Sequence, residues 1–445
     1  MERALVFVPV NLQSSHPKRC AVYVFDAETG HHRPELTIEI PELGGSFPAV
    51  DMKVTALAVG PGGASVILVA WSSLPQGEAC FPYVIDMQEH HPSAANLGGF
   101  PLESGGSPPE VTGGMVVGPD AGQTFLAFNY LYTMNRFNFA GATGVGNGPY
   151  GVAVSPDGTR VYVTNAADGT VSVLNPTVSP TGSPGLVGLV PVGHNPQGVA
   201  VTPDSAHAYV ANSADGTVSV IDASSLATNT FAVAANPQGV AVAPDGKHVY
   251  VAHGAPTNAL RVIDPASPGT GQVSIPTFDG TCAVAVTPDS RHVWVLCAPT
   301  SASTPARLVQ IATEGPHMNE VIKTIDVSAL APLVVPQFVG VFVSAPINRE
   351  EIGVLSDIEV QSPVVRGNST TARVFIEHAL SRPTYVWPGF AGSSPDAVLP
   401  PRITIPAGAK HADFDVYVSP LQPPGEIRVA AAAVFVKSKG LLVKA

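Results

Sequence analysis

A repeated position in this chain holds several residue types that bind metals. It lies nine residues before a recurring turn proline, and over six copies it is occupied by Met52, Glu110, Asn147, His194, Ala235 and Asp279. Carboxylate, amide and imidazole groups are ligands of divalent cations such as Ca²⁺. The Glu, Asn, His and Asp of this series would therefore form a metal site if the fold gathered them. The alternative is that they are ordinary turn and capping residues, because loop lengths differ between copies.

A second repeated position carries no charge. It lies six residues before each turn proline and is occupied by Thr55, Gly113, Tyr150, Gln197, Gln238 and Cys282. This series offers neither a pair of carboxylates for acid–base chemistry nor a cage for a hard cation. We expect it to line the mouth of a channel and to contribute to binding.

These residues are positioned by copies of one sequence motif, which is called the repeated phrase below. Its best copies begin at Gly151, Gly198, Gly239 and Ala283. Their turn prolines, Pro156, Pro203, Pro244 and Pro288, are spaced by 47, 41 and 44 residues, which is the period of a four-stranded propeller blade. Within a copy, two alternating apolar runs flank a turn such as Pro-Asp-Gly and predict a β-hairpin, and a third strand follows.

The copies resemble the YVTN β-propeller repeats of bacterial and archaeal proteins, through the residues Tyr162 to Asn165. The resemblance covers residues 149 to 297, and weaker copies surround Pro61 and Pro119. It implies a β-propeller. In propeller lactonases and sugar-lactone hydrolases, a converging Glu, Asn, His and Asp hold a catalytic metal, so this resemblance makes Glu110, Asn147, His194 and Asp279 the alternative metal site.

The two ends of the repeat region should complete one another. Residues 4–10 match the second strand of a copy, and residues 337–343 match a first strand. Pairing them would close the ring and remove two exposed sheet edges. We therefore expect an all-β chain in which residues 1–345 form a seven-bladed β-propeller.

Residues 346–445 lose the repeat and contain short alternating strands, which predict a β-sandwich. The segment from Leu399 to Val416 resembles a conserved segment of bacterial Ig-like domains, as does the segment from Val365 to Val374. This resemblance implies a spacer or adhesive module without an active site.

Composition and charge narrow the possible partners. The chain is 45% hydrophobic and 13% charged, and its net charge of −12 argues against nucleic acid and anionic membranes. No apolar stretch has the length of a membrane helix, so we expect no membrane insertion. The segment Met1–Pro9 is not a convincing signal peptide, which suggests a cytoplasmic or non-classically exported protein. The family resemblance suggests an extracytoplasmic one, and the compartment stays open.

The cysteines allow one cross-strand pair. A hairpin centred on Asp289 and Ser290 would place Cys282 opposite Cys297. A disulfide is sterically possible there, and two reduced thiols are the alternative.

Three longer loops enter the third strands of neighbouring copies, within residues 11–26, 71–86 and 297–312. Loops on a rigid scaffold commonly build binding surfaces. The expected binding residues, in these loops and at the channel mouth, are Tyr150, His194, Gln197, Gln238, His16, Lys18, Arg19 and Gln76. We expect the opposite face, with the Pro-Asp-Gly turns, to be inert.

Two functions fit this sequence. The favoured one is a non-enzymatic recognition or scaffolding protein without a cofactor, whose partner is a protein or glycan. The alternative is a hydrolase or lyase of the propeller lactonase kind that uses one divalent cation. Fold alone does not decide between them, because propellers host both.

Overall fold

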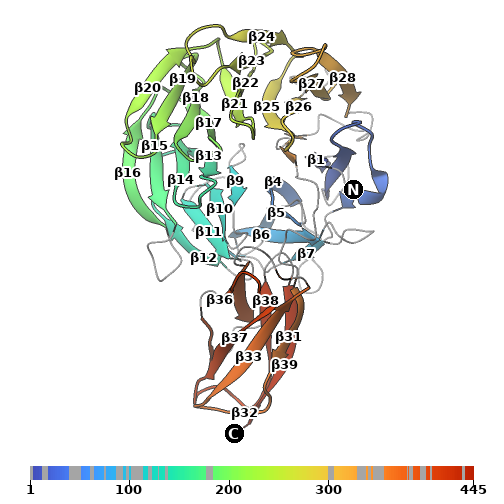
Figure 1. Cartoon of the computed structure of the whole chain (residues 1–445), viewed down its shortest axis with the longest axis vertical. Coiled ribbons are helices and arrows are strands. Elements are labelled where there is room, and N and C mark those ends of the chain that lie inside the picture. Colours follow the sequence, from blue (N-terminus) through green and yellow to red (C-terminus); the bar gives the residue numbers. More distant parts are fainter. Residues whose placement is uncertain are drawn as a thin grey trace. The chain divides into compact units, whose positions relative to one another are not determined.

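The regular structure of the described residues is β-strand apart from one short helix (Figure 1). The computed structural model describes residues 4–12, 19–39, 52–60, 65–74, 77–86, 94–96, 100–101, 114–118, 123–128, 130–135, 139–176, 184–298, 305–327, 337–338, 342–343, 355–377, 379, 384–390, 397–400, 403–432 and 436–444. One short 3-10 helix, η1 (Pro34–Leu36), lies among them. No described helix combines the length and the apolar character needed to cross a membrane.

The chain divides into two compact units. The first consists of Met1–Pro119, Phe125–Thr133 and Ala140–Ile347. The second consists of Asp120–Thr124, Met134–Phe139 and Asn348–Ala445.

The repeated phrase forms a four-stranded antiparallel sheet. In the copy that begins at Gly151, the strands are β13 (Pro149–Val154), β14 (Val161–Asn165), β15 (Thr170–Asn175) and β16 (Gly185–Pro191), paired in that order. The second strand is buried along its whole length because both of its faces pack against neighbouring sheets. The outermost strand is mostly exposed. Each such sheet is called a blade here and is named by its innermost strand.

Three further described blades repeat this order along the chain. They contain β17 (Pro196–Val201), β18 (His207–Asn212), β19 (Thr217–Asp222) and β20 (Thr228–Ala232); β21 (Pro237–Val242), β22 (Val249–His253), β23 (Ala259–Ile263) and β24 (Val273–Pro276); and β25 (Thr281–Val286), β26 (His292–Cys297), β27 (Arg307–Ala312) and β28 (Val321–Asp326).

The weaker copies also form sheets. Their strands are β4 (Met52–Val59), β5 (Ser65–Leu74), β6 (Gly77–Asp86), β7 (Ala94–Asn96) and β8 (Phe100–Pro101) in one, and β9 (Met115–Val117), β10 (Gln123–Ala127), β11 (Leu131–Asn135) and β12 (Phe139–Thr143) in the other.

One blade contains strands from both ends of the repeat region. Here β1 (Leu5–Leu12) pairs with β2 (Arg19–Asp26), which pairs with β3 (Ile38–Glu39). On its other side β1 pairs antiparallel with β29 (Gln337–Phe338) and β30 (Phe342–Val343). Val10 lies opposite Phe338, and Val6 lies opposite Val343.

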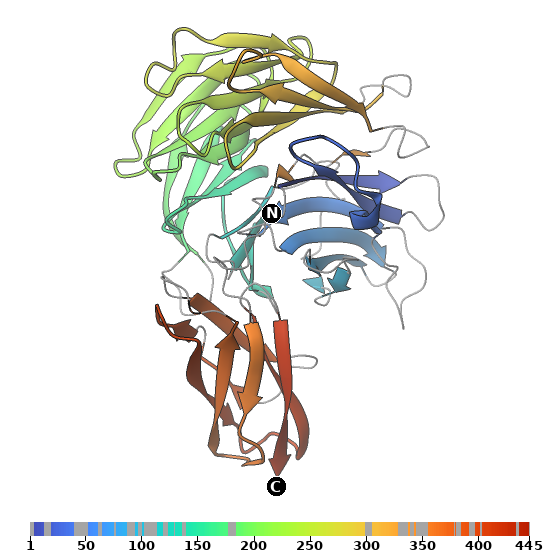
Figure 2. The same ribbon diagram turned by 45° about the vertical axis from the view of Figure 1, so that its right-hand side comes forward.

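The innermost strands follow one another in a closed circle. Strand β9 contacts β4 and β13, β17 lies between β13 and β21, and β25 follows β21. Strand β30 contacts both β25 and β4, which completes the circle. Figures 1 and 2 show the blades from β13 to β28 in chain order around it. This all-β arrangement is a β-propeller.

Glycine is required where neighbouring innermost strands approach each other. A Cβ atom at Gly151 would collide with the carbonyl oxygen of Gln197, and one at Gly198 would collide with that of Gln238. The Thr164 hydroxyl donates to the Gln197 carbonyl at 2.8 Å and so links the β13 and β17 blades. The small residues of the repeat are therefore a packing requirement.

The innermost strands begin with a β-bulge that the sequence did not predict. In β13 the register shifts between Pro149 and Val152, and equivalent shifts occur in β4, β17, β21 and β25. In β25 the bulge places Thr281, not Cys282, opposite Cys297. The expected register, with Cys282 opposite Cys297, is wrong for this reason, and both residues are free thiols, which was the alternative to a disulfide.

The second unit contains two sheets, drawn in orange and red in Figure 2. Their strands are β31 (Leu355–Val360), β33 (Ser369–Ile376), β37 (His411–Val418) and β35 (Ala397–Val398) in one, and β32 (Val364–Val365), β39 (Val436–Lys444), β38 (Gly425–Ala432), β34 (Thr384–Phe390) and β36 (Ile403–Ile405) in the other. Alternate residues of β37 are buried. One core, which includes Val374, Phe414, Val429 and Leu441, joins the two sheets.

Candidate functional site

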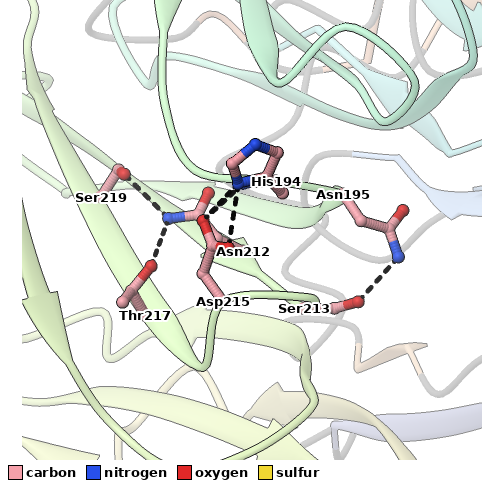
Figure 3. Close-up of polar contacts among 7 residues, drawn as sticks. All are labelled: His194, Asn195, Asn212, Ser213, Asp215, Thr217 and Ser219. Atoms are coloured by element: carbon pink, nitrogen blue, oxygen red, sulfur yellow. Dashed lines mark hydrogen bonds and ion pairs between the residues drawn. The ribbon is translucent and has the colours of Figure 1, made fainter.

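The loops at the start of the innermost strands form the mouth face of the propeller, opposite the turn face with its Pro-Asp turns. On the mouth face of the β17 blade, His194 precedes β17 and Asp215 lies between β18 and β19. The His194 backbone amide donates to Asp215 Oδ2 at 2.7 Å. The imidazole Nδ1 lies 3.0 Å from Asp215 Oδ1 and 3.1 Å from Oδ2 (Figure 3).

This contact fixes the chemical character of the histidine. Because an ionised carboxylate only accepts hydrogen bonds, Nδ1 must carry the proton, and the lone pair of a neutral imidazole is then on Nε2. Nε2 bonds to no residue that the structure describes, and the His194 side chain is 85% exposed. The His194 backbone amide holds the pKa of the Asp215 carboxyl below its usual range, so Asp215 is ionised at neutral pH. The pair can act as a general base.

Buried polar residues hold the loop of Asp215. Asn212, which is fully buried, donates through Nδ2 to Thr217 Oγ1 and to Ser219 Oγ, both at 2.9 Å (Figure 3). The loop that precedes β17 is tied to the same turn, because Asn195 Nδ2 donates to Ser213 Oγ at 2.8 Å. A side chain at Gly193 would meet Asp215 and Asn212, so this position must be glycine for the loops to approach.

Two of the other expected metal ligands make hydrogen bonds to residues in nearby loops. Asn147 donates from its backbone and its side chain to Asp168, at 2.7 and 3.0 Å. Asp279 accepts a hydrogen bond of 2.6 Å from Nδ2 of Asn258, a residue of the preceding blade. Glu110 lies outside the described residues. Across the part of the chain that is described, no three His, Cys, Asp or Glu side chains form a metal-binding group.

The uncharged series lies in the bulges of the innermost strands. Tyr150, Gln197 and Gln238 lie within the register shifts of β13, β17 and β21, and Cys282 within that of β25. Burial raises the pKa of Tyr150, and the charge that Cys282 would carry adds to the rise. Burial also raises the pKa of Cys282 to about 12. These two side chains are therefore neutral near pH 7.

The expected long-loop residues are mostly not described. His16, Lys18 and Gln76 lie outside the described residues, and Arg19 is the first residue of β2, opposite Leu12. One of the three expected loops is instead mainly strand. The pairing of β5 with β6 continues as far as Leu74 opposite Gly77, so the strands of this blade are longer than the repeat predicts.

Sequence reasoning missed Asp215 as the partner of His194. The signal was present, because His194 and Asp215 are 21 residues apart and so are Asn147 and Asp168. The recurrence of Ala-Asp-Gly at this offset in two adjacent copies would have paired the two loops.

Comparisons with known proteins give the fold. No family model matches the chain, and no curated protein matches its sequence. A candidate 6-phosphogluconolactonase from Bacteroides fragilis is 16% identical, with a TM-score of 0.55 over 76% of this chain and 98% of that chain. The periplasmic gluconolactonase of Pseudomonas aeruginosa is 14% identical, with a TM-score of 0.55 over 77% of this chain and 99% of that one.

A candidate 6-phosphogluconolactonase from Bacteroides uniformis is similar to the same degree, with 14% identity and a TM-score of 0.54 over 77% of this chain and 100% of that one. At these identities the likeness shows a shared β-propeller fold. Our expectation of a non-enzymatic recognition or scaffolding protein is wrong by this comparison, because solved structures with this fold along nearly their whole length are named as lactonases.

Proposed function

We propose that this chain is a lactonase-like hydrolase that opens a sugar lactone at the mouth face. The observation that carries the proposal is the His194–Asp215 pair. It provides an oriented imidazole on the mouth face, and the exposed Nε2 of this imidazole bonds to no described residue. The named activities of the structural neighbours supply the substrate class.

The chemistry requires one water molecule and one proton carrier. Nε2 of His194 removes a proton from water as the water oxygen attacks the lactone carbonyl carbon. The bond between that carbon and the ring oxygen then breaks, and the imidazolium returns the proton to the departing alkoxide. The product is a hydroxy acid. Asp215 keeps Nδ1 protonated throughout and stabilises the imidazolium, as carboxylates do in other His–carboxylate pairs.

The β13 blade supplies a matched variant. Asn147 occupies the slot of His194 and contacts Asp168 in the same way, through both its backbone and its side chain. His194→Asn should therefore keep the loop and remove the base. We expect the rate of glucono-δ-lactone hydrolysis to fall by about 10²- to 10⁴-fold, the usual contribution of a general base. The rate is measured in a pH-stat as the release of acid.

The controls separate catalysis from folding. Asp215→Asn should also lower the rate, because the amide no longer selects the Nδ1 proton, whereas Asp168→Asn in the β13 blade should leave it unchanged. The 6-phosphorylated lactone is assayed in parallel. If the wild-type chain accelerates neither lactone above the spontaneous rate, or if His194→Asn retains full activity, the proposal is wrong.

Finer features of the molecule are also proposals. We propose a ring of seven blades of the YVTN type, over residues 1–345, and an Ig-like module over residues 346–445. The repeated phrase and the two-sheet core of the second unit support them. An extracytoplasmic location is supported by the periplasmic neighbour, and fractionation of the source cells would test it.

A further inference from the structure

A cavity lies on the turn face, at the end of β17 opposite to His194. Its volume is about 820 Å³, and it is open between the β17 and β21 blades. The β17 blade contributes Asp204, Tyr209 and Asp222, and the β21 blade contributes Asp245 and Gly246. We expected this face to be inert, and the cavity gives a reason to revise that expectation.

The cavity occurs where a contact between neighbouring turns is missing. The amide of Asp157 in the β13 blade donates to Ser205 Oγ in the β17 blade at 3.1 Å. The amide of Asp245 in the β21 blade donates in the same way to Ser290 Oγ in the β25 blade, also at 3.1 Å. Between the β17 and β21 blades the corresponding slot is Gly246, which has no hydroxyl. The Asp204 amide therefore has no such partner among the described residues.

The backbone at Gly246 does not require glycine. Its φ is 72°, and serine occupies the same slot with φ of 62° at Ser205 and 60° at Ser290. A Cβ atom at Gly246 would have nothing within 4 Å. The turn would therefore accept serine, and glycine leaves the space between the two blades open.

Two carboxylates of the cavity each leave one oxygen unused by the described residues. Oδ1 of Asp204 accepts from the Thr202 hydroxyl at 2.5 Å and from the Ala206 amide at 3.0 Å. Oδ1 of Asp222 accepts from both the amides and the hydroxyls of Ser224 and Ser225. The hydroxyls of Thr202 and Ser224 lower the pKa values of Asp204 and Asp222, so both are ionised.

A buried tyrosine hydroxyl completes the wall. Tyr209 is only 3% exposed, yet it lines the cavity. Burial raises its pKa, and the charges of Asp204 and Asp264 add to this. No described residue bonds to its hydroxyl. At the adjoining interface, where the turns are linked, the hydroxyl of Tyr162 in the same slot is sealed from solvent.

We propose that this cavity binds a small linear polyamine, with ammonium groups on the free oxygens of Asp204 and Asp222 and on the Tyr209 hydroxyl. Across the described residues no three acidic or imidazole side chains approach closely enough to hold a metal ion, which favours charges spread along a chain. Methylene segments suit the apolar walls formed by Val220, Ala266 and Pro268. The net charge of −12 attracts cations to the protein.

The test is calorimetric titration of the full chain with spermidine at low salt. We expect one site per chain. Gly246→Ser should install the missing link to the Asp204 amide and narrow the cavity, which should weaken binding by about tenfold or more. Its unfolding midpoint should be unchanged or higher. Gly158→Ser, in the same slot of the β13 blade, is the matched control and should bind as the wild type does.

A second pair of variants guards against an indirect effect. Asp204→Asn should weaken spermidine binding by a similar factor, whereas Asp157→Asn, in the equivalent turn, should not. The absence of a wild-type signal overturns the proposal, and so does wild-type affinity in both Gly246→Ser and Asp204→Asn. Binding of a lysine-rich peptide without binding of spermidine also overturns it, because it would assign the surface to a protein partner.

Discussion

The β13 and β17 blades share a scaffold but differ in what it presents. In both, a fully buried Asn at the end of the second strand, Asn165 or Asn212, donates to a Thr and a Ser of the third strand. In both, an Asp in the next turn accepts from the loop before the innermost strand. The side chain that this loop presents is the amide of Asn147 in the β13 blade and the imidazole of His194 in the β17 blade. The hydrogen bonds that hold the loop are thus independent of the side chain that could do chemistry.

Opening the ring should have the largest effect on the stability of both blades. Deleting residues 1–10 removes most of β1, the partner of β29 and β30, and leaves unpaired sheet edges. We expect loss of the cooperative thermal unfolding transition of the propeller, measured by circular dichroism. Removing residues 350–445 is the control and should leave a folded ring. If the first deletion leaves the unfolding midpoint unchanged, ring closure does not stabilise the blades.

Replacing either buried asparagine should have an intermediate effect on stability, and the loss should be equal in the two blades. Asn165→Ala or Asn212→Ala removes a buried amide donor to the Thr and Ser hydroxyls of the third strand. Each should lower the free energy of unfolding by about 1 to 3 kcal/mol. Denaturant unfolding of both variants measures this cost. Clearly unequal losses would show that the two loops are not held in the same way.

Acid should produce the smallest effect. The backbone amides of Asn147 and His194 lower the pKa values of Asp168 and Asp215, respectively. A carboxyl with a lower pKa in the folded state contributes stability above its unfolded pKa of about 3.9, and that stability is lost as the pH falls. The unfolding midpoint should therefore decrease between about pH 5 and pH 3. Asp168→Asn and Asp215→Asn should each make this decrease shallower, and an unchanged slope would contradict it.

The repeat itself was sufficient to predict the propeller. Turn prolines at the blade period, with alternating runs on either side, predicted the hairpins around Pro156 and Pro203. The strand starts could not be predicted, because the bulges depend on how Gly151 and Gly198 pack against the carbonyl of the next blade. That contact lies between copies, and the repeat pattern describes only one copy.

The candidate site was predicted in part. His194 was selected by its slot, as were Asn147 and Asp279, but the hydrogen bonds that these three side chains make were not predicted. Each of these side chains is bound by a partner in a nearby loop, and such short-range pairing competes with convergence on the axis. The turn-face cavity was missed because its cause is a missing hydroxyl at Gly246, and this is visible only once the turns of neighbouring blades are known to touch.

The interchange of Asn147 and His194 on one scaffold also has a genetic aspect. The codons for asparagine and histidine differ only in their first base. In a gene built from duplicated segments, one nucleotide change in one copy is enough to exchange a loop cap for an imidazole. The remaining copies keep the ring folded while that variant is selected. A repeat protein of this kind can therefore acquire a reactive group in a single mutational step.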